Sequence, residues 1–233
     1  MTPPAATELR INRDAPVART TLPPGSWVDV VAGFAREASD RFAELHAAGR
    51  WEQREVLRYD RYVPERRLGT GFRAERHPLL RQTDLLLRSR YGRPFDGVAG
   101  ILYRDGDDFQ GLHTDREMRW LDDTLIAILV LGARRPFVLR PRGDAVPIER
   151  VPPGRDPSDV VLLPGEGDLL VMGGACQREW LHGVPAAPGV EAPRMSLTWR
   201  WTSRQGRPDT NPTFYDGRHF SDGSRQPGTR TRR

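Results

Sequence analysis

Seven short apolar segments, separated by turn residues, fill the part of this 233-residue chain that follows Pro94. Short runs bounded by Gly, Pro and Asp are typical of β-strands, and strands at such close spacing form a sandwich or a barrel. The sequence therefore predicts an all-β core. The predicted strands are Val98–Tyr103, Thr124–Leu131, Pro136–Leu139, Val160–Leu163, Asp168–Met172, Trp180–Val184 and Met195–Trp201.

Two helices are predicted ahead of this core. Apolar residues recur at helical spacing from Val28 to Gly49, and again over Leu79–Tyr91 after His77-Pro78. Gly92 and Pro94 end the second pattern, because neither residue continues a helix easily. Both helices are expected to support the strands.

The two ends of the chain differ in composition from the middle. Residues 1–24 are polar and bear prolines, so they are expected to form a flexible arm. From residue 204 onward seven arginines stand against three aspartates, which accounts for most of the formal net charge of +5. We expect residues 25–203 to form one domain and residues 204–233 a disordered basic tail, which either binds a polyanion or is simply solvated.

Missing residue types exclude several classes of protein. The sequence contains no lysine, so neither a P-loop lysine nor a Schiff-base lysine is possible. Its one cysteine, Cys176, can form neither an internal disulfide nor a Cys-based zinc site, so any metal site must use histidine and carboxylate. No segment reaches the ~20 apolar residues that cross a bilayer, and residues 1–10 lack the pattern of a signal peptide, so we expect a cytoplasmic protein.

One group of residues has the composition of a metal site. His113 and Asp115 point to the same face if their segment is extended, and His182 comes from a later predicted strand. Two histidines and one carboxylate form the facial triad that leaves open coordination positions on iron(II), although a hydrolytic zinc site can use the same residue types. The remaining histidines are expected to be solvated or to cap helices: His46, His77 and His219.

A binding site for a second substrate separates these alternatives. Arg194 and Arg200 lie six residues apart on one predicted strand and share a face, with Ser196 and Thr198 between them. A dicarboxylate would meet two guanidinium groups and two hydroxyls there, and Tyr103 can add a phenol. A solvent-facing strand shows the same alternation, so both interpretations stay open.

In order and spacing these motifs resemble the AlkB family of 2-oxoglutarate dioxygenases. The resemblance implies an α+β protein with a double-stranded β-helix (jelly-roll) core and N-terminal supporting helices. It further implies that residues 25–203 are the dioxygenase domain. The segments that carry it are 102–108, His113-Thr114-Asp115, 167–174, 180–185 and 194–200.

The resemblance also implies a set of ligands. Fe(II) would be held by His113, Asp115 and His182, with O2 and 2-oxoglutarate as cosubstrates. The residues that would hold 2-oxoglutarate are Tyr103, Arg194 and Arg200, helped by Ser196. Many family members have Asn two residues before the tyrosine, whereas this chain has Ile101, so one amide contact is expected to be missing.

The activity that the resemblance implies is oxidative demethylation. 2-Oxoglutarate would be decarboxylated to succinate while an N-methyl group is hydroxylated, releasing formaldehyde and a repaired base of DNA or RNA. We expect a monomer acting on single-stranded nucleic acid or a flipped base, without a membrane. The alternatives are a hydroxylase of a small molecule or protein, and a nucleic-acid-binding protein with an inactive metal site.

We expect the residues that contact the substrate to lie in a segment rich in arginine and aromatic residues, Arg54–Arg73, which the resemblance places at the family's substrate lid. Tyr59, Tyr62 and Arg66 are the candidates there. Glu117 follows Asp115 by two residues and can accept a hydrogen bond from an exocyclic amine, although an ordinary surface acid would fit the sequence as well.

Overall fold

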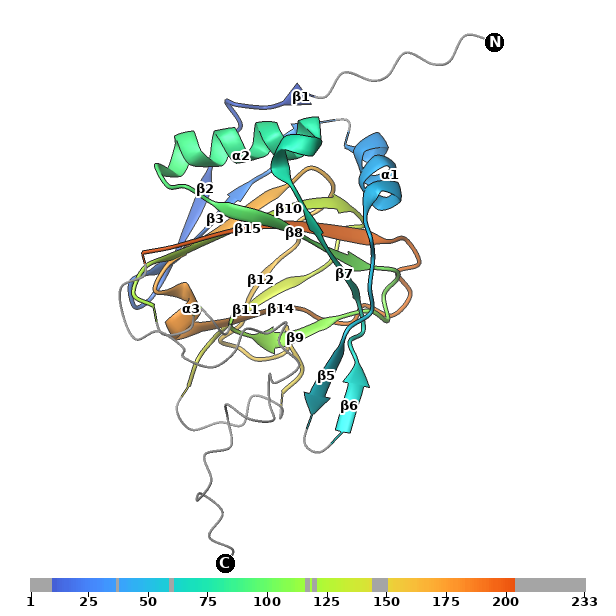
Figure 1. The fold of residues 1–233 in the computed structure, drawn as a ribbon. Coiled ribbons are helices and arrows are strands. Elements are labelled where there is room, and N and C mark those ends of the chain that lie inside the picture. The colour runs from blue at the N-terminus through green and yellow to red at the C-terminus, as the bar shows by residue number, and fades with distance from the viewer. Residues whose placement is uncertain are drawn as a thin grey trace, which may run out of the picture.

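Two antiparallel sheets that face each other form the centre of the protein (Figure 1). The structure is a computed structural model that describes residues 10–36, 38–58, 61–115, 118, 121–143 and 151–203. In spatial order the larger sheet consists of β2 (Ala18–Leu22), β3 (Ser26–Val31), β13 (Leu169–Gly174), β10 (Thr124–Gly132), β15 (Arg194–Thr202), β8 (Asp96–Tyr103) and β7 (Leu68–Phe72). The smaller sheet consists of β12 (Val160–Leu162), β11 (Phe137–Pro141), β14 (Trp180–Val184) and β9 (Gln110–His113).

Shorter elements surround the two sheets. The helices α1 (Ser39–Ala48) and α2 (Pro78–Tyr91) cover the outer face of the larger sheet (Figure 1). No helix in the described ranges is long and apolar enough to cross a bilayer. The other elements are β1 (Arg10–Ile11), β4 (Ala35–Arg36), the hairpin of β5 (Glu55–Arg58) and β6 (Arg61–Pro64), the 3-10 turn η1 (Ala74–Arg76) and α3 (Cys176–Glu179).

The central strand β10 of the larger sheet is apolar on both faces because it is covered on both. Leu129 of β10 and Trp199 of β15 pack outward under the two helices. Ile128 and Val130 of β10 pack inward against Phe137 of the smaller sheet. The long apolar run of β10 is therefore what a central strand buried on both faces requires.

The sequence-based strands and the expected fold class are confirmed. All seven predicted strands are present, and each end lies within two residues of its predicted position. The helix after His77-Pro78 is also confirmed. The Leu79 N–H donates to His77 Nδ1 at its start, and Gly92 takes the left-handed conformation (φ +62°) at its end.

The helix expected from Val28 is wrong over its first part. Residues 26–31 form β3, and the helix begins only at Ser39. Gly33 has φ +60°, which a helix cannot contain, and pairing with β13 favours the strand although the apolar spacing resembles that of a helix.

The arm expected over residues 1–24 is wrong for residues 18–22. These residues form β2, which pairs with β3. A bidentate ion pair from Arg19 to the buried Asp29 joins the two strands, with Nε–Oδ1 and Nη2–Oδ2 distances of 2.6 and 2.8 Å. The Pro23-Pro24-Gly25 sequence is thus the turn of a hairpin and no boundary. Residues 1–9 and 204–233 lie outside the described residues, so the tail stays a prediction.

Candidate metal centre

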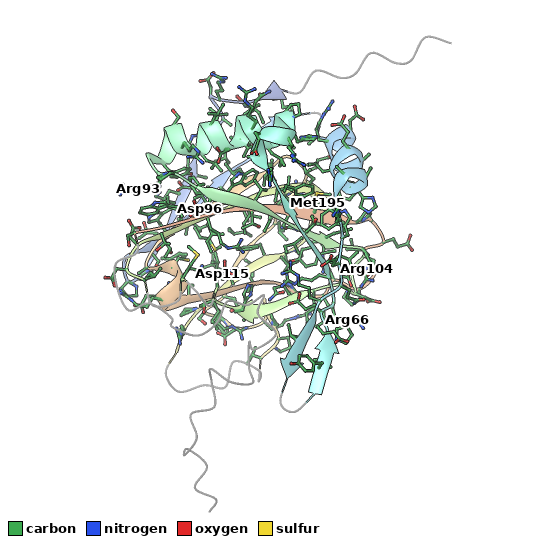
Figure 2. All side chains as sticks on the ribbon, in the orientation of Figure 1. Arg66, Arg93, Asp96, Arg104, Asp115 and Met195 are labelled. Carbon is green, nitrogen blue, oxygen red and sulfur yellow. The ribbon has the colours of Figure 1, made fainter. Side chains whose placement is uncertain are left out.

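The three residues expected to bind metal come together between the two sheets. His113 at the end of β9 pairs with His182 of β14, and their ring centroids lie 4.3 Å apart. Asp115 follows β9 at once, and one ligand atom from each of the three residues lies within 4.8 Å of the others. Figure 2 shows Asp115 in the space between the sheets. Strand pairing thus brings residues 69 positions apart in sequence into one cluster.

Hydrogen bonds fix the orientation of two members of this triad. His113 Nδ1 lies 2.9 Å from the Gly111 carbonyl, so the N–H is placed there and Nε2 faces Asp115 Oδ1 at 3.6 Å. Asp115 Oδ2 accepts from Arg200 Nε at 2.6 Å. The Asp115 backbone N–H donates to Gln177 Oε1 at 2.8 Å. One carboxylate oxygen is therefore held by arginine, while the other is directed at the histidine.

The electrostatics favour the protonation states that a metal ion requires. Burial opposes ionisation of Asp115, but the Arg200 guanidinium and the two histidines hold the pKa of its carboxyl well below the usual range. Burial, together with the nearby His113, lowers the pKa of His182 to about 3. Near neutral pH Asp115 is charged and His182 is neutral with a lone pair, which suits a divalent first-row metal ion. His182 Nδ1 is also buried without a hydrogen-bond partner among the described residues.

The inner face of β15 is buried, so the interpretation as a solvent-facing strand is wrong. Arg194 is 0% exposed, Ser196 5% and Thr198 6%. Arg200 lies nearer the surface, with 31% of its side chain exposed, and reaches the metal carboxylate. All four share the face that looks toward the smaller sheet, since their neighbours Met195, Leu197 and Trp199 pack under the helices.

Two fully buried arginines, one on this face of β15 and one in a neighbouring loop, have no carboxylate partner among the described residues. Arg194 donates only from Nη1, to the carbonyls of Pro164 (3.3 Å) and Arg135 (3.5 Å), and its Nε and Nη2 are unpaired. Arg135, in the loop between β10 and β11, donates to the carbonyls of Asp105, Asp108 and Pro185. Burial lowers the pKa of Arg194 to about 10, so it is still charged near neutral pH. Buried charge without a counter-ion is costly, and a bound dianion would neutralise it.

Tyr103 lies beside these two arginines. It pairs with Arg194 across β8 and β15, is 4% exposed, and lies with its ring 5.4 Å from the Arg135 guanidinium. Ile101, on the same face, pairs with Ser196. The position at which the sequence resemblance led us to expect an amide therefore lies on the inner face of the sheet, and here it is apolar.

Two residues of the site were missed in the sequence. Arg135 was not singled out in the sequence, although its guanidinium donates to the carbonyls of Asp108, just before β9, and of Pro185, just after β14. Gln177 lies in the short helix α3, and its side-chain oxygen accepts a hydrogen bond from the backbone N–H of Asp115. Neither has a sequence signal, because their partners are carbonyl and amide groups of distant segments.

The candidate substrate residues are only partly described. Tyr62 (53% exposed) and the exposed Arg66 belong to the β5–β6 hairpin and the segment after it. Tyr59 and Glu117 lie outside the described residues. A cavity of about 340 Å³ lies between this hairpin and β9, and it is lined by Val56, Val63, Pro64, Glu65, Arg66, Arg67, Phe109, Gln110 and Gly111.

Comparisons with known proteins agree with this geometry. Residues 61–200 match the model of the 2OG-Fe(II) oxygenase superfamily. The chain is 30% identical over 204 residues to human (Homo sapiens) alpha-ketoglutarate-dependent dioxygenase alkB homolog 3, covering 79% of this chain and 66% of that protein. It is 35% identical over 113 residues to human DNA oxidative demethylase ALKBH2, covering 47% of this chain and 40% of that protein.

The fold comparison reaches more distant proteins. A Pseudomonas putida prolyl-4-hydroxylase superimposes with a TM-score of 0.51 at 17% identity, over 76% of this chain and 92% of that one. This likeness shows a common fold. The chain spans about two thirds or less of the length of the two human relatives.

Proposed function

Because this chain belongs to the 2OG-Fe(II) oxygenase superfamily, we propose that it is an iron(II)- and 2-oxoglutarate-dependent dioxygenase that demethylates N-alkylated nucleobases. The observation that carries the proposal is the pairing of two features on one buried face. A His-Asp-His triad lies at the Arg200 end of the inner face of β15, and arginines that have no counter-ion among the described residues lie at the Arg194 end. A hydrolytic zinc site has no need of the second feature.

The chain's own residues define where the two cosubstrate carboxylates would lie. Arg194 and Arg200 are six residues apart on β15, which places their Cα atoms about 20 Å apart. Since Arg200 Nε contacts Asp115, this arginine marks the metal end. Arg194 and Tyr103 mark the distal end. A dicarboxylate lying along the strand would therefore reach from the triad to the unpaired Arg194 donors.

Each triad residue has a defined task in this site. His113, Asp115 and His182 would hold the metal, and Arg200 would keep the second Asp115 oxygen away from it. When bound, iron(II) and 2-oxoglutarate supply the oxidising chemistry, in which O2 oxidises a substrate C–H bond while 2-oxoglutarate becomes succinate and CO2. The buried walls of β10, β15 and β11 exclude water from the reacting atoms.

Support for a nucleobase substrate comes from the relatives, one of which is called a DNA oxidative demethylase. Hydroxylation of an N-methyl group gives an N-hydroxymethyl group, which loses formaldehyde and leaves N–H on the base. A base must leave its stack to reach a site between two sheets, so a single strand or a flipped base is required. The hairpin with Tyr62 and Arg66 lies beside the site and has the aromatic and cationic groups that contact nucleic acid. We further propose a cytoplasmic monomer.

The test is to measure succinate and formaldehyde from the full chain supplied with Fe(II), 2-oxoglutarate, O2 and a methylated single-stranded oligonucleotide. We expect both products from the wild type and neither from the Asp115→Ala or His182→Ala protein. Succinate without formaldehyde would mean that the enzyme hydroxylates another substrate. Neither product from a folded, iron-loaded wild type would mean a binding protein with an inactive site.

A further inference from the structure

Tyr103 lies between two arginines on the inner face of the larger sheet. On one side β15 pairs it with Arg194. On the other side β7 pairs Gly69 with Ile101, two residues before Tyr103. Arg67 precedes Gly69 by two residues, so continuing this antiparallel register places it next to Tyr103 on the same face. A row thus crosses three neighbouring strands, formed by Arg194 on β15, Tyr103 on β8 and Arg67 directly before β7.

Arg67 is oriented but incompletely paired. Only 13% of its side chain is exposed, and its Nη2 donates to Glu65 Oε1 at 2.9 Å. Its Nε is buried without a hydrogen-bond partner in the described part of the chain. Burial raises the pKa of Tyr103, while the charges of Arg67, Arg194 and Arg135 act in the opposite direction. All three guanidinium groups are therefore within electrostatic range of the tyrosine.

Arg67 lies at the distal end of the proposed cosubstrate site, beside Tyr103 and Arg194. Arg200 contacts Asp115 and marks the metal end, so the row with Tyr103 lies at the distal end. Ile101 contributes no amide there. Gly69, which pairs with Ile101, adds no side chain next to Arg67 on this face of the sheet.

We propose that Arg67 is a third arginine of the cosubstrate site, donating from its unpaired Nε to the distal carboxylate of 2-oxoglutarate. Glu65 is then a positioning residue that holds the guanidinium in place. The inference rests on the proposed function, since it assigns a contact of that same cosubstrate.

The test measures 2-oxoglutarate binding by calorimetry to the Mn(II)-loaded full chain, which binds without turning over. Arg67→Gln should raise the Kd about tenfold, the value of one charge-assisted hydrogen bond. Arg73→Gln is the matched control, because Arg73 is an exposed arginine just after β7 and its loss removes the same charge. Its Kd should stay within about twofold of the wild type, as expected for an exposed charge.

A second ligand separates a direct contact from a general structural effect. 2-Oxopentanoate has the same chain length but lacks the distal carboxylate, so its Kd should be the same in the wild type and in Arg67→Gln. An unchanged 2-oxoglutarate Kd in Arg67→Gln, or an equal loss for both ligands, would overturn the inference. A wild-type protein that binds Mn(II) but not 2-oxoglutarate would instead overturn the proposed function.

Discussion

The buried charge of Arg194 gives a prediction in which stability and binding change in opposite directions. Burial lowers its pKa to about 10, from an ordinary value of about 12.5. At about 1.4 kcal/mol for each pKa unit, holding the charge destabilises the folded protein by about 3 kcal/mol near neutral pH. Arg194→Met keeps most of the stem and removes this cost, while losing two long hydrogen bonds to carbonyls that together contribute about 1 to 2 kcal/mol.

The net effect without 2-oxoglutarate is therefore a stabilisation of about 1 to 2 kcal/mol, or a Tm higher by about 2 to 8 °C. The order should reverse when ligand is added. A hundredfold excess of 2-oxoglutarate over its Kd stabilises the Mn(II)-loaded wild type by about 2.7 kcal/mol, whereas the variant should not respond. The assay is thermal unfolding of both proteins with and without 2-oxoglutarate. A variant that is less stable without ligand, or that keeps the ligand-induced rise in Tm, would refute the reasoning.

Three other residues give predictions of different kinds. Gln177→Ala should weaken Mn(II) binding about tenfold, because losing a group that hydrogen-bonds to a metal ligand typically lowers metal affinity by about 10- to 100-fold. An unchanged Mn(II) Kd in calorimetry would rule out a role of Gln177 in orienting Asp115. Burial raises the pKa of the Cys176 thiol to about 12, so a thiol reagent at pH 8 should label Cys176 only after the protein unfolds. Fast labelling of the native protein would contradict the buried position of this thiol. Asp29→Ala should lower the free energy of unfolding by about 1 to 2 kcal/mol, because it removes the hydrogen bonds that this buried carboxylate accepts from Arg19 and Tyr91, while the half-exposed Arg19 stays solvated. A loss under about 0.5 kcal/mol in urea unfolding would show that these contacts contribute little.

The core strands and the triad could be predicted because their signals are local or carried by residue type. Strands such as Trp180–Val184 are short apolar runs between turn residues. His113 and Asp115 are separated by the two-residue period of an extended chain, and with five histidines there were few choices for a third ligand.

Burial and long-range pairing could not be predicted from the sequence. The alternation from Arg194 to Arg200 looks the same on a solvated strand as on a buried one, and only the facing sheet decides between them. Val28, Val31 and Phe34 have helical spacing, yet pairing with β13 made a strand of the first two. Arg135 and Arg67 act through carbonyls and neighbours that the sequence does not connect to them.

The central claim is that this protein demethylates a nucleobase, with the triad holding iron(II) and the arginines holding 2-oxoglutarate. The most direct test is to measure the mass of a methylated single-stranded oligonucleotide before and after reaction. After incubation with the full chain, Fe(II), 2-oxoglutarate and O2, mass spectrometry should show the unmethylated oligonucleotide. The methyl group should remain when 2-oxoglutarate is omitted or Asp115 is replaced by alanine. An oligonucleotide that stays methylated while the wild type converts 2-oxoglutarate to succinate would contradict the claim.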